Sequence, residues 1–319
     1  MDKNVTRNSD KMKGSIKLKI INRIAKIPAL RKYIPSRLYL EWQWAKSGFT
    51  PFDWDNPQTV NQKMQWLKLH DHNPLYTIFV DKFMAKLWLE KQFGQAHIVK
   101  TLATYKQASQ IDLDKLPNRF VLKCNHDCDS VYFCFDKQSG KFFDKHMKEF
   151  TFVEIAKKLD DALQVNYYYG TREWPYRNVK PCILAEEMLL QADGALPNDY
   201  KIFFIGEDPQ FIYVSYDRMG INDRCTYDIN WKRLPFVWIS GDDVTDKSNT
   251  TNVPRPKSLD DMLVYGAKIA KYMKCVRLDF YDVDGKMYFG EITPFHSAGY
   301  SPFTPEKYDL FYGQKIKLK

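Results

Sequence analysis

The stretch VRLDFYDVDGKMYFGEIT, residues 276–293, carries the clearest structural pattern in the sequence. Apolar and charged side chains alternate along its first half, and Asp284-Gly285 separates two runs rich in aromatic and β-branched residues. Alternation with a period of two is typical of a strand, and Asp-Gly is a frequent turn between paired strands. The stretch therefore predicts a β-hairpin.

The length of the hairpin loop decides which way its charged residues face. With a two-residue loop, Asp279 and Glu291 would point to opposite faces of the hairpin. With a three-residue loop, 283–285, the two carboxylates would instead share one face with Arg277. Gly285 would then take the left-handed position that such a loop needs. We predict the three-residue loop.

Two carboxylates and a guanidinium on one face are typical of a magnesium site beside a bound anion. Magnesium prefers oxygen ligands and often bridges protein carboxylates to phosphates. The residues alone leave a second interpretation open, in which an amphipathic edge hairpin carries ion pairs exposed to solvent.

Length and composition limit the class of protein. A chain of 319 residues with 44% hydrophobic and 27% charged residues is typical of a globular protein with two or three packed subdomains. No apolar run reaches the roughly 18 residues of a membrane span, and the N-terminus lacks a signal-peptide pattern. The six scattered cysteines argue against a disulfide framework and favour a reducing cytoplasm. The spacing of Cys124, His126 and Cys128 does not match a structural zinc site.

Residues 1–37 form a strongly basic segment, with eleven Lys and Arg against two Asp, in a chain of net charge +9. Isoleucines recur in this segment at helical spacing, as Ile16, Ile20, Ile24 and Ile27. The pattern predicts an amphipathic arm that either lies on an anionic membrane surface or packs on the body of the protein. No nucleic-acid-binding motif is present, so no nucleic acid partner is expected.

The rest of the chain predicts helical and extended segments in an α+β fold. Helical patterns occupy residues 38–75, 81–94, 144–166 and 258–273, the last with Ser258 as its cap. Strand patterns occupy residues 97–105, 116–124, 130–135, 182–190 and 198–218, with a turn at Gly206-Glu207. A long aromatic and basic loop is expected over residues 167–181.

Motifs on these segments resemble, in their order, the ATP-grasp ligases: Asp81-Lys82, FVLK at 120–123, ILAEEML at 183–189 and then the hairpin. More closely, the sequence resembles the TupA-like ATP-grasp family, which is named for teichuronopeptide biosynthesis and occurs among bacterial surface-polysaccharide genes. This resemblance runs from about residue 40 to residue 312. It rests on MQWLKLHDHNPLYTIFVDK (64–82), KLPNRFVLKCNHD (115–127), YYYGTREW (167–174), AEE (185–187) and VDGKMYFGEIT (283–293).

The resemblance implies an ATP-grasp fold, in which two α+β subdomains enclose a nucleotide cleft. A basic arm (1–37) and a helical region (38–100) are expected to precede them. The first subdomain (101–187) would carry the phosphate loop and the hinge, and the second subdomain (188–319) would carry the metal site.

The resemblance also implies a function. ATP-grasp enzymes typically phosphorylate a carboxylate, and an amine or similar nucleophile then attacks the acyl phosphate. The expected activity is an ATP- and Mg²⁺-dependent carboxylate–amine ligase of bacterial surface-polysaccharide biosynthesis or modification, for example of a capsule. Expected partners are a polysaccharide or lipid-linked glycan acceptor and a small-molecule amine or amino acid. The expected location is the cytoplasm, with peripheral attachment at the inner face of the plasma membrane as a further expectation.

Two alternative functions stay open. One is a nucleotide- or sugar-binding protein on the same fold that has lost its chemistry, and the other is a glycosyl- or phosphotransferase that acts on the same polymer.

The resemblance assigns nucleotide-binding roles to residues of the first subdomain. It places Lys82 and Lys123 on the phosphates, where two cations can neutralise a polyphosphate. It places Asp127 and Ser130 in the loop that covers them. The hinge that meets adenine and ribose matches Glu186, Glu187 and Met188.

The resemblance assigns the metal ligands and the catalytic cations to the second subdomain. Asp279 and Glu291 match the magnesium ligands, and Lys201 points into the same cleft. Arg277 matches the arginine that stabilises negative charge on the transferring phosphoryl group. His296 is expected to be a hydrogen-bonded loop residue.

Two departures from the family pattern favour the alternative in which the protein binds a nucleotide or sugar but has lost its chemistry. The loop within FVLKCNHDCDSVYF, residues 120–133, has no glycine, although the family pattern there is rich in Gly and Ser. Asp129 would repel a triphosphate at this place unless a metal ion or a lysine intervenes. Thr293 lies where ATP-grasp sites commonly have an Asn.

Overall fold

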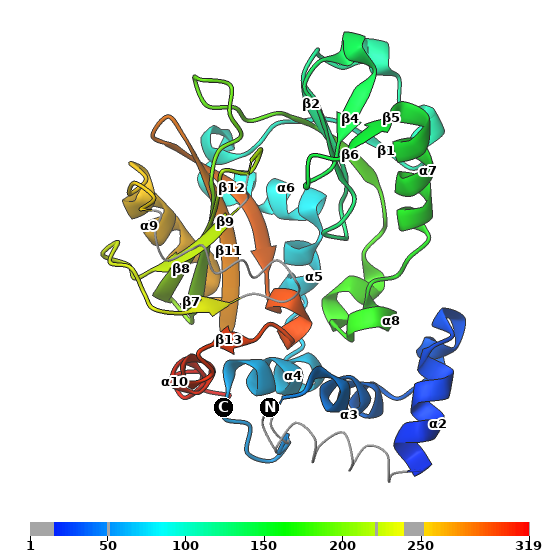
Figure 1. The fold of residues 1–319 in the computed structure, drawn as a ribbon, viewed down its shortest axis with the longest axis vertical. Helices are drawn as coiled ribbons and strands as arrows, with labels where there is room; N and C mark the ends of the chain where they lie inside the picture. Colours follow the sequence, from blue (N-terminus) through cyan, green and yellow to red (C-terminus); the bar gives the residue numbers. More distant parts are fainter. Residues whose placement is uncertain (1–15, 50–51, 221–222, 239–251, 319) are drawn as a thin grey trace.

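The computed structural model describes residues 16–49, 52–220, 223–238 and 252–318. Two antiparallel sheets form the body of the protein, and a helical base lies across one end of them (Figure 1). Residues 1–15 of the predicted basic arm lie outside the described residues. None of the described helices is both long and apolar enough to cross a lipid bilayer.

The first sheet has six strands in the order β1-β6-β2-β3-β4-β5. The strands are β1 (Thr101–Tyr105), β2 (Phe120–Cys124), β3 (Val131–Cys134), β4 (Lys141–Phe143), β5 (Glu149–Thr151) and β6 (Ile183–Glu187). Helix α7 (Phe152–Leu163) covers one face, because its buried Ile155 and Leu159 pack in the same apolar cluster as Phe120 and Leu122.

The helix predicted over residues 144–166 begins later than expected. Residues 149–151 pair with β4 as a strand, and Thr151 then caps α7 in a capping box with Glu154. A reciprocal box of this kind fixes the first turn of a helix by satisfying two of its free N–H groups. The helical prediction was therefore wrong for the segment before Phe152.

The second sheet has five strands in the order β12-β11-β7-β8-β9. The strands are β7 (Asp199–Ile205), β8 (Asp208–Tyr216), β9 (Asp223–Tyr227), β11 (Cys275–Val283) and β12 (Lys286–Thr293). Gly206-Glu207 forms the turn between β7 and β8, as predicted.

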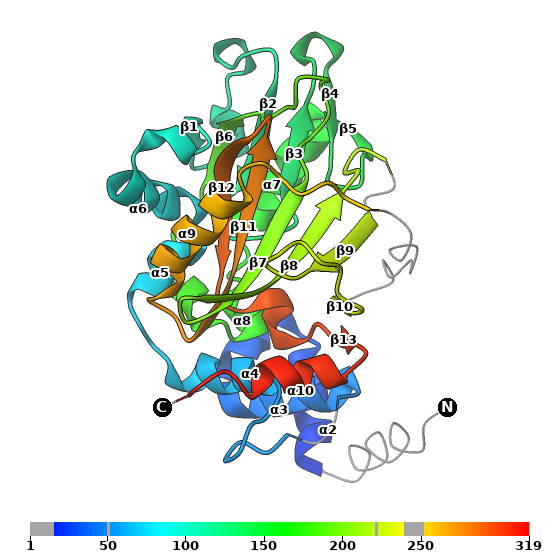
Figure 2. The ribbon, with the colours of Figure 1, turned by 90° about the vertical axis from the view of Figure 1, so that its left-hand side faces the viewer.

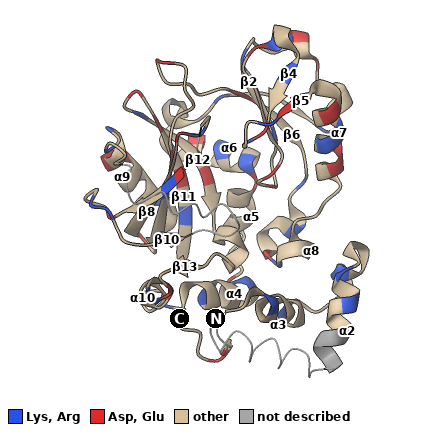
Figure 3. Cartoon of the chain, in the orientation of Figure 1, with Lys and Arg blue, Asp and Glu red and all other residues tan. Residues whose placement is uncertain are grey.

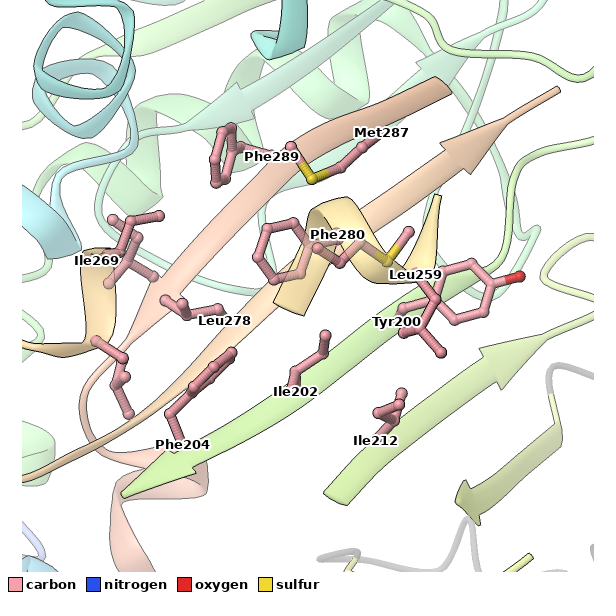
Figure 4. Close-up of a cluster of buried hydrophobic side chains, with 14 of the residues drawn as sticks. Tyr200, Ile202, Phe204, Ile212, Leu259, Ile269, Leu278, Phe280, Met287 and Phe289 are labelled. Carbon is pink, nitrogen blue, oxygen red and sulfur yellow. The ribbon is translucent and has the colours of Figure 1, made fainter. Parts of the chain in front are cut away.

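Helix α9 (Leu259–Ala270) covers one face of this sheet (Figure 4). Alternate strand residues such as Ile202, Leu278 and Phe280 are buried beneath the helix. Because strand side chains alternate between faces, Lys201 and Asp279 lie on the opposite face, toward the first sheet.

Ser258 has a different role from the predicted helix cap. Its N–H and its hydroxyl both donate to Asp282 Oδ2, at 2.9 and 2.6 Å, and its side chain makes no capping bond. The residue thus fastens the start of α9 to β11.

The hairpin of β11 and β12 differs from its predicted form. Val283 pairs with Lys286, so the loop has two residues, Asp284 and Gly285, with φ of 52° and 91°. The predicted three-residue loop was wrong. Both loop residues have a positive φ, as a two-residue hairpin turn of type I′ requires.

A β-bulge nevertheless brings the two carboxylates together. Phe280 pairs with Phe289, but the next pair is Asp279 with Glu291, so Gly290 is the extra residue. A bulge shifts the pairing by one residue, so the side chains of the bulged strand beyond it point to the opposite face of the sheet. A Cβ atom at Gly290 would lie 3.0 Å from the Asp279 carbonyl oxygen, which explains the need for glycine there.

The helical base is built from segments at both ends of the chain (Figure 2). It contains α2 (Ile16–Ala25), α3 (Ser36–Ser47), α4 (Val60–His70) and α10 (Lys307–Gly313), and α5 (Leu75–Val80) and α6 (Lys82–Phe93) lead from it to the sheets. Asn73-Pro74 separates α4 from α5, and Gly94 ends α6 with φ of 78°.

Short elements complete the described chain. The predicted loop over 167–181 contains helix α8 (Tyr168–Thr171) and the 3₁₀ turn η6 (Trp174–Asn178). The remaining short elements are η1 (Pro28–Tyr33), η2 (Gln95–His97), η3 (Ala108–Gln110), η4 (Leu113–Lys115), η5 (Lys137–Ser139), η8 (His296–Gly299) and the paired strands β10 (Val237–Trp238) and β13 (Phe303–Thr304).

Candidate functional site

A cleft of about 290 Å³ lies between the two sheets. Charged residues from both sheets line it, and Figure 3 marks the charged positions along β11 and β12. Eight Lys and Arg and five Asp and Glu line the cleft, so it carries an excess of positive charge. Such a cleft attracts an anionic ligand.

The wall formed by the first sheet holds a buried carboxylate between two lysines. Glu186, on β6, contacts Lys86 of α6 and lies 2.6 Å from the Nζ atom of Lys123 on β2. Burial opposes ionisation of Glu186, but the charges of the two lysines hold its pKa below the usual value. Burial also lowers the pKa of Lys86 to about 8. Glu186 thus orients both ammonium groups at the cleft, and the neighbouring Glu187 and Met188 line its rim.

The wall formed by the second sheet centres on Asp279. Arg277 donates to Asp279 through Nε at 2.7 Å and through a terminal nitrogen at 2.8 Å, and Lys201 lies 2.9 Å from the same carboxylate. Burial opposes ionisation, but the charges of Arg277 and Lys201 lower the pKa of Asp279 to about 2. Lys201 also contacts Asp199. Thr293 accepts a hydrogen bond from Arg277 at 3.2 Å.

Glu291 lies directly opposite Asp279 in the sheet and lines the cleft. Unlike Asp279, it makes no ion pair or hydrogen bond through its carboxylate within the part of the chain that the structure describes. Directly opposite residues in a sheet have Cβ atoms about 5 Å apart. The pair therefore presents one compensated and one uncompensated carboxylate at the same point of the cleft.

The carboxylate pair fits a magnesium ion only together with an anionic ligand. Within the described ranges, no group of three or more His, Cys, Asp and Glu residues could hold a metal by itself. Magnesium commonly takes one or two protein carboxylates and completes its six ligands with phosphate oxygens and waters. Asp279 and Glu291 meet that requirement.

The predicted phosphate loop, between β2 and β3, is held together by its own residues. The Asp127 carboxylate accepts from the Ser130 N–H at 3.1 Å and from the Ser130 hydroxyl at 2.6 Å. Lys82 donates to the Asp127 carbonyl oxygen. Neither Asp127 nor Ser130 lines the cleft, whereas Cys128 and Lys82 do. In the structure these two side chains shape the loop by bonding within their own turn, and their nucleotide contacts stay a prediction.

The charge of Asp129 is compensated by a lysine. Lys145, in the β4–β5 connection, lies 2.7 Å from the Asp129 carboxylate and lines the cleft. The repulsion expected from the sequence between Asp129 and a polyphosphate is thus opposed by a cation from another segment. The pair is exposed, so its own contribution to stability is below about 1 kcal/mol.

The two histidines near these motifs are structural. His296 is buried and its Nδ1 contacts Arg277; burial and the Arg277 charge hold its pKa well below the usual value, so the neutral ring can accept the bond. His126 is buried, and its Nε2 lies 3.2 Å from the carbonyl oxygens of Ala162 and Val165. The expectation that His296 is a hydrogen-bonded loop residue is confirmed.

Several cleft residues were missed in the sequence. Lys86 follows Lys82 by one helical turn, and this i, i+4 spacing was a usable signal. No motif marks the other missed charged residues: Lys145 and Arg218 lie in connections, Asp199 begins strand β7, and Arg224 lies on strand β9, which was not predicted.

The model of the TupA-like ATPgrasp family matches residues 62–317. This chain belongs to that family. The family resemblance found in the sequence is confirmed, and with it the ATP-grasp fold in which two α+β subdomains enclose a cleft. No curated protein is significantly similar to the chain in sequence.

Solved structures of ATP-grasp ligases are distantly similar. The D-alanine–D-alanine ligase of Helicobacter pylori has 14% identity and a TM-score of 0.42, covering 81% of this chain and 68% of that one. The corresponding ligase of Bacillus anthracis has 12% identity and a TM-score of 0.38, covering 74% of this chain and 60% of that one. A third structure is the RiPP-associated ATP-grasp ligase of Chryseobacterium gregarium in complex with ADP and a leader and core peptide. It has 11% identity and a TM-score of 0.39, covering 80% of this chain and 65% of that one. The chain thus spans about three fifths of the B. anthracis ligase.

Proposed function

We propose that this TupA-like ATP-grasp protein is an ATP-dependent ligase that joins a carboxylate to an amine or a related nucleophile through an acyl phosphate. The observation that carries the proposal is the cleft itself. The carboxylates of Asp279 and Glu291 lie on one wall, and Lys82 and Lys123 line the same cleft from the first sheet and α6. A metal-binding pair beside separate cations suits a bound polyphosphate.

Residues of the first sheet would bind and orient the nucleotide. ATP bound with Mg²⁺ would supply the phosphoryl group. Lys123 is held at the cleft by Glu186 and Lys82 by the loop carbonyl of Asp127, so both ammonium groups are positioned before a ligand enters. The exposed Glu187 carboxylate suits ribose hydroxyls, and the Met188 backbone suits an adenine edge.

Residues of the second sheet would hold the metal and stabilise charge at the reacting group. Asp279 and Glu291 would hold Mg²⁺. Asp279 and His296 fix the Arg277 guanidinium, so its charge is in place where negative charge grows on the transferred group and the carboxylate. Lys201 is held by Asp199 and Asp279 beside the same point.

The surplus of cations supports an acidic acceptor such as a surface polysaccharide or a lipid-linked glycan. Arg224 and Lys145 come from different sheets and both line the cleft. Burial opposes the charge of Lys145, but its contact with Asp129 raises its pKa overall, against a small repulsion from Arg224. Arg218 lines the same region. A carboxylate or phosphate on the acceptor would relieve this repulsion. An amino acid or small amine would serve as the nucleophile, in the cytoplasm.

The test combines nucleotide binding with turnover. Isothermal titration with MgATP should show binding that ADP competes with, and ADP release should rise when a uronic-acid polymer and an amino acid are both present. Glu291→Gln is the matched control, because it keeps the shape of the side chain and removes the metal ligand. Absence of any ATP binding contradicts the proposal. Binding without turnover in any acceptor panel would favour a nucleotide-binding protein that has lost its chemistry.

A further inference from the structure

Helix α2 and turn η1 carry an exposed surface that mixes apolar and basic side chains at the outer edge of the helical base (Figure 1). Its apolar members are unusually exposed: Ile20 by 53%, Ile27 by 50%, Leu30 by 37% and Tyr33 by 71%. Its basic members are the exposed Arg23, Lys26 and Lys32. We call these seven residues the α2–η1 surface.

Helix α2 ends at Ala25, and Ile27 follows it as the extended residue that precedes η1, with φ of −96° and ψ of 106°. Ile20 therefore lies on α2, and Ile27 lies in the connection to η1. In a 3₁₀ helix, positions three apart are eclipsed, so Leu30 and Tyr33 lie on one side of η1. The exposed apolar side chains thus come from three successive parts of one segment.

A different set of apolar residues satisfies the packing of α2 on the protein. Ile21, Ala25 and Ile34 are buried against Tyr39 and Trp42 of α3. Of the isoleucine stripe predicted from the sequence, Ile24 is partly buried and Ile20 and Ile27 are exposed, while the Ile16 side chain lies outside the described ones. Packing on the body thus uses Ile21 and Ala25 of α2, whereas Ile20 and Ile27 stay exposed among the described residues.

Hydrogen bonds from the body hold η1 in place. The buried Arg172 donates to the carbonyl oxygens of Arg31 and Ile34, at 2.6 and 3.0 Å, and its guanidinium lies 3.9 Å from the centre of the Tyr39 ring. Charge-assisted bonds of this kind are about twice as strong as neutral ones. The η1 part of the α2–η1 surface is therefore anchored by a buried side chain.

The charge of the segment is of one sign. Residues 11–40 contain no Asp or Glu, whereas other strongly exposed apolar residues have acidic neighbours: Val153 precedes Glu154, and Val264 follows Asp260 and Asp261 on α9. A surface with apolar side chains between cations, and with no anions, matches the interface of an anionic bilayer.

We infer that the α2–η1 surface binds the face of an anionic lipid bilayer. The isoleucines and Leu30 enter the boundary between headgroups and acyl chains, Tyr33 lies at headgroup level, and Arg23, Lys26 and Lys32 contact lipid phosphates. A nucleic acid would use the cations but would offer nothing to the four apolar side chains. This inference is independent of the proposed ligase activity, since no cleft residue takes part.

Vesicle flotation of the full chain tests the inference. The protein should float with vesicles of phosphatidylglycerol and phosphatidylcholine, should float far less with phosphatidylcholine alone, and should be released by high salt. Replacing Arg23, Lys26 and Lys32 together by Gln should weaken binding on the order of a hundredfold at low ionic strength, at about fivefold for each cation. Replacing Ile20, Ile27 and Leu30 together by Asn should weaken it at least as strongly.

The matched control replaces Val153 and Val264 by Asn, which removes exposed apolar groups elsewhere and should leave flotation unchanged. Unchanged thermal unfolding shows that each variant is folded. Unchanged flotation of the isoleucine variant overturns the inference. Equal flotation on neutral vesicles overturns it as well, and so does binding to a DNA duplex in place of vesicles.

Discussion

The two walls of the cleft differ in how completely their carboxylates are compensated. On β6, Glu186 is held between two lysines, so its charge is neutralised within the wall. On the hairpin, Asp279 is paired with Arg277 and Lys201, whereas Glu291 beside it contacts no cation among the described residues. The buried carboxylate of the first wall is thus paired without a ligand, whereas the second wall keeps Glu291 for a ligand.

Burial alone does not decide the state of these carboxylates. Glu186 and Glu173 are both buried, at 3% and 2% exposure, yet their pKa values shift in opposite directions. The two lysines that contact Glu186 lower its pKa, while burial raises the pKa of Glu173 to about 7 against the weaker effect of Lys68. Lys68 instead donates to Gln65, Thr171 and Ala298. Direct contact with a cation is therefore the property that separates these two buried carboxylates.

The largest effects are expected when the two hairpin carboxylates are removed one at a time. Both Asp279→Asn and Glu291→Gln should abolish ATP-dependent ADP release, because each removes a metal ligand. Only Asp279→Asn should also destabilise the fold, by about 3 kcal/mol or more, since it leaves the buried Arg277 without its counter-charge and leaves Lys201 with Asp199 alone. Urea unfolding of the two variants measures this difference. Equal stability of the two would contradict the distinction between a compensated and an uncompensated carboxylate.

The stability of the first wall should depend on the balance between Glu186 and its two lysines. Glu186→Gln should destabilise the protein by about 3 kcal/mol, because Lys86 and Lys123 then repel each other in a buried site. Adding Lys86→Met removes one of these charges and should recover more than about 1 kcal/mol. The four proteins of this double-mutant cycle are compared by urea unfolding. If the double variant is less stable than Glu186→Gln alone, the lysine repulsion is not the cause.

Glu173 offers a test by pH. Its pKa is raised from 4.5 to about 7 by burial, so the folded protein binds a proton there that the unfolded chain has already lost. Its contribution to stability therefore falls as the pH rises through this window. Glu173→Gln does not titrate, so its free energy of unfolding relative to the wild type should rise by up to about 3 kcal/mol between about pH 5 and about pH 8. The exposed Glu207→Gln is the control and should show no such trend.

The bulge at Gly290 decides whether Glu291 faces the same way as Asp279. Gly290→Ala would place a Cβ 3.0 Å from the Asp279 carbonyl oxygen and 3.1 Å from the Tyr281 ring, so the strand must shift there. We expect turnover to fall about a hundredfold, with a loss of stability of about 1–3 kcal/mol. Gly285→Ala, at φ of 91° in the turn, should cost stability and leave turnover of the folded protein unchanged. A Gly290→Ala enzyme with full turnover would show that the bulge is dispensable.

The same bulge marks the limit of prediction from the sequence. Motif order predicted the family and the cleft, and the residue pattern predicted that the two strands of the hairpin pair, because these depend on local patterns. The facing of Asp279 and Glu291 was also correct, but for the wrong reason: loop length was assumed to set it, whereas the register changes at Gly290. A bulge has no periodic signal, since one added glycine looks like any other strand residue. For the same reason the sequence could not pair Asp129 with Lys145, because two loops must fold before they meet.

The exposed ion pair of Asp129 and Lys145 gives the smallest expected effect on stability, in contrast to the buried ion pairs of Glu186 and Asp279. Lys145→Met should change stability by less than about 1 kcal/mol, yet it should weaken ATP binding by up to about tenfold because Asp129 then faces the polyphosphate uncompensated. Asp129→Asn alone should tighten ATP binding slightly, since it frees the Lys145 charge for the ligand. The double variant should bind ATP about as tightly as the wild type, as titration calorimetry can measure. If the double variant binds as weakly as Lys145→Met, Lys145 contacts the nucleotide itself, and screening of Asp129 is not its role.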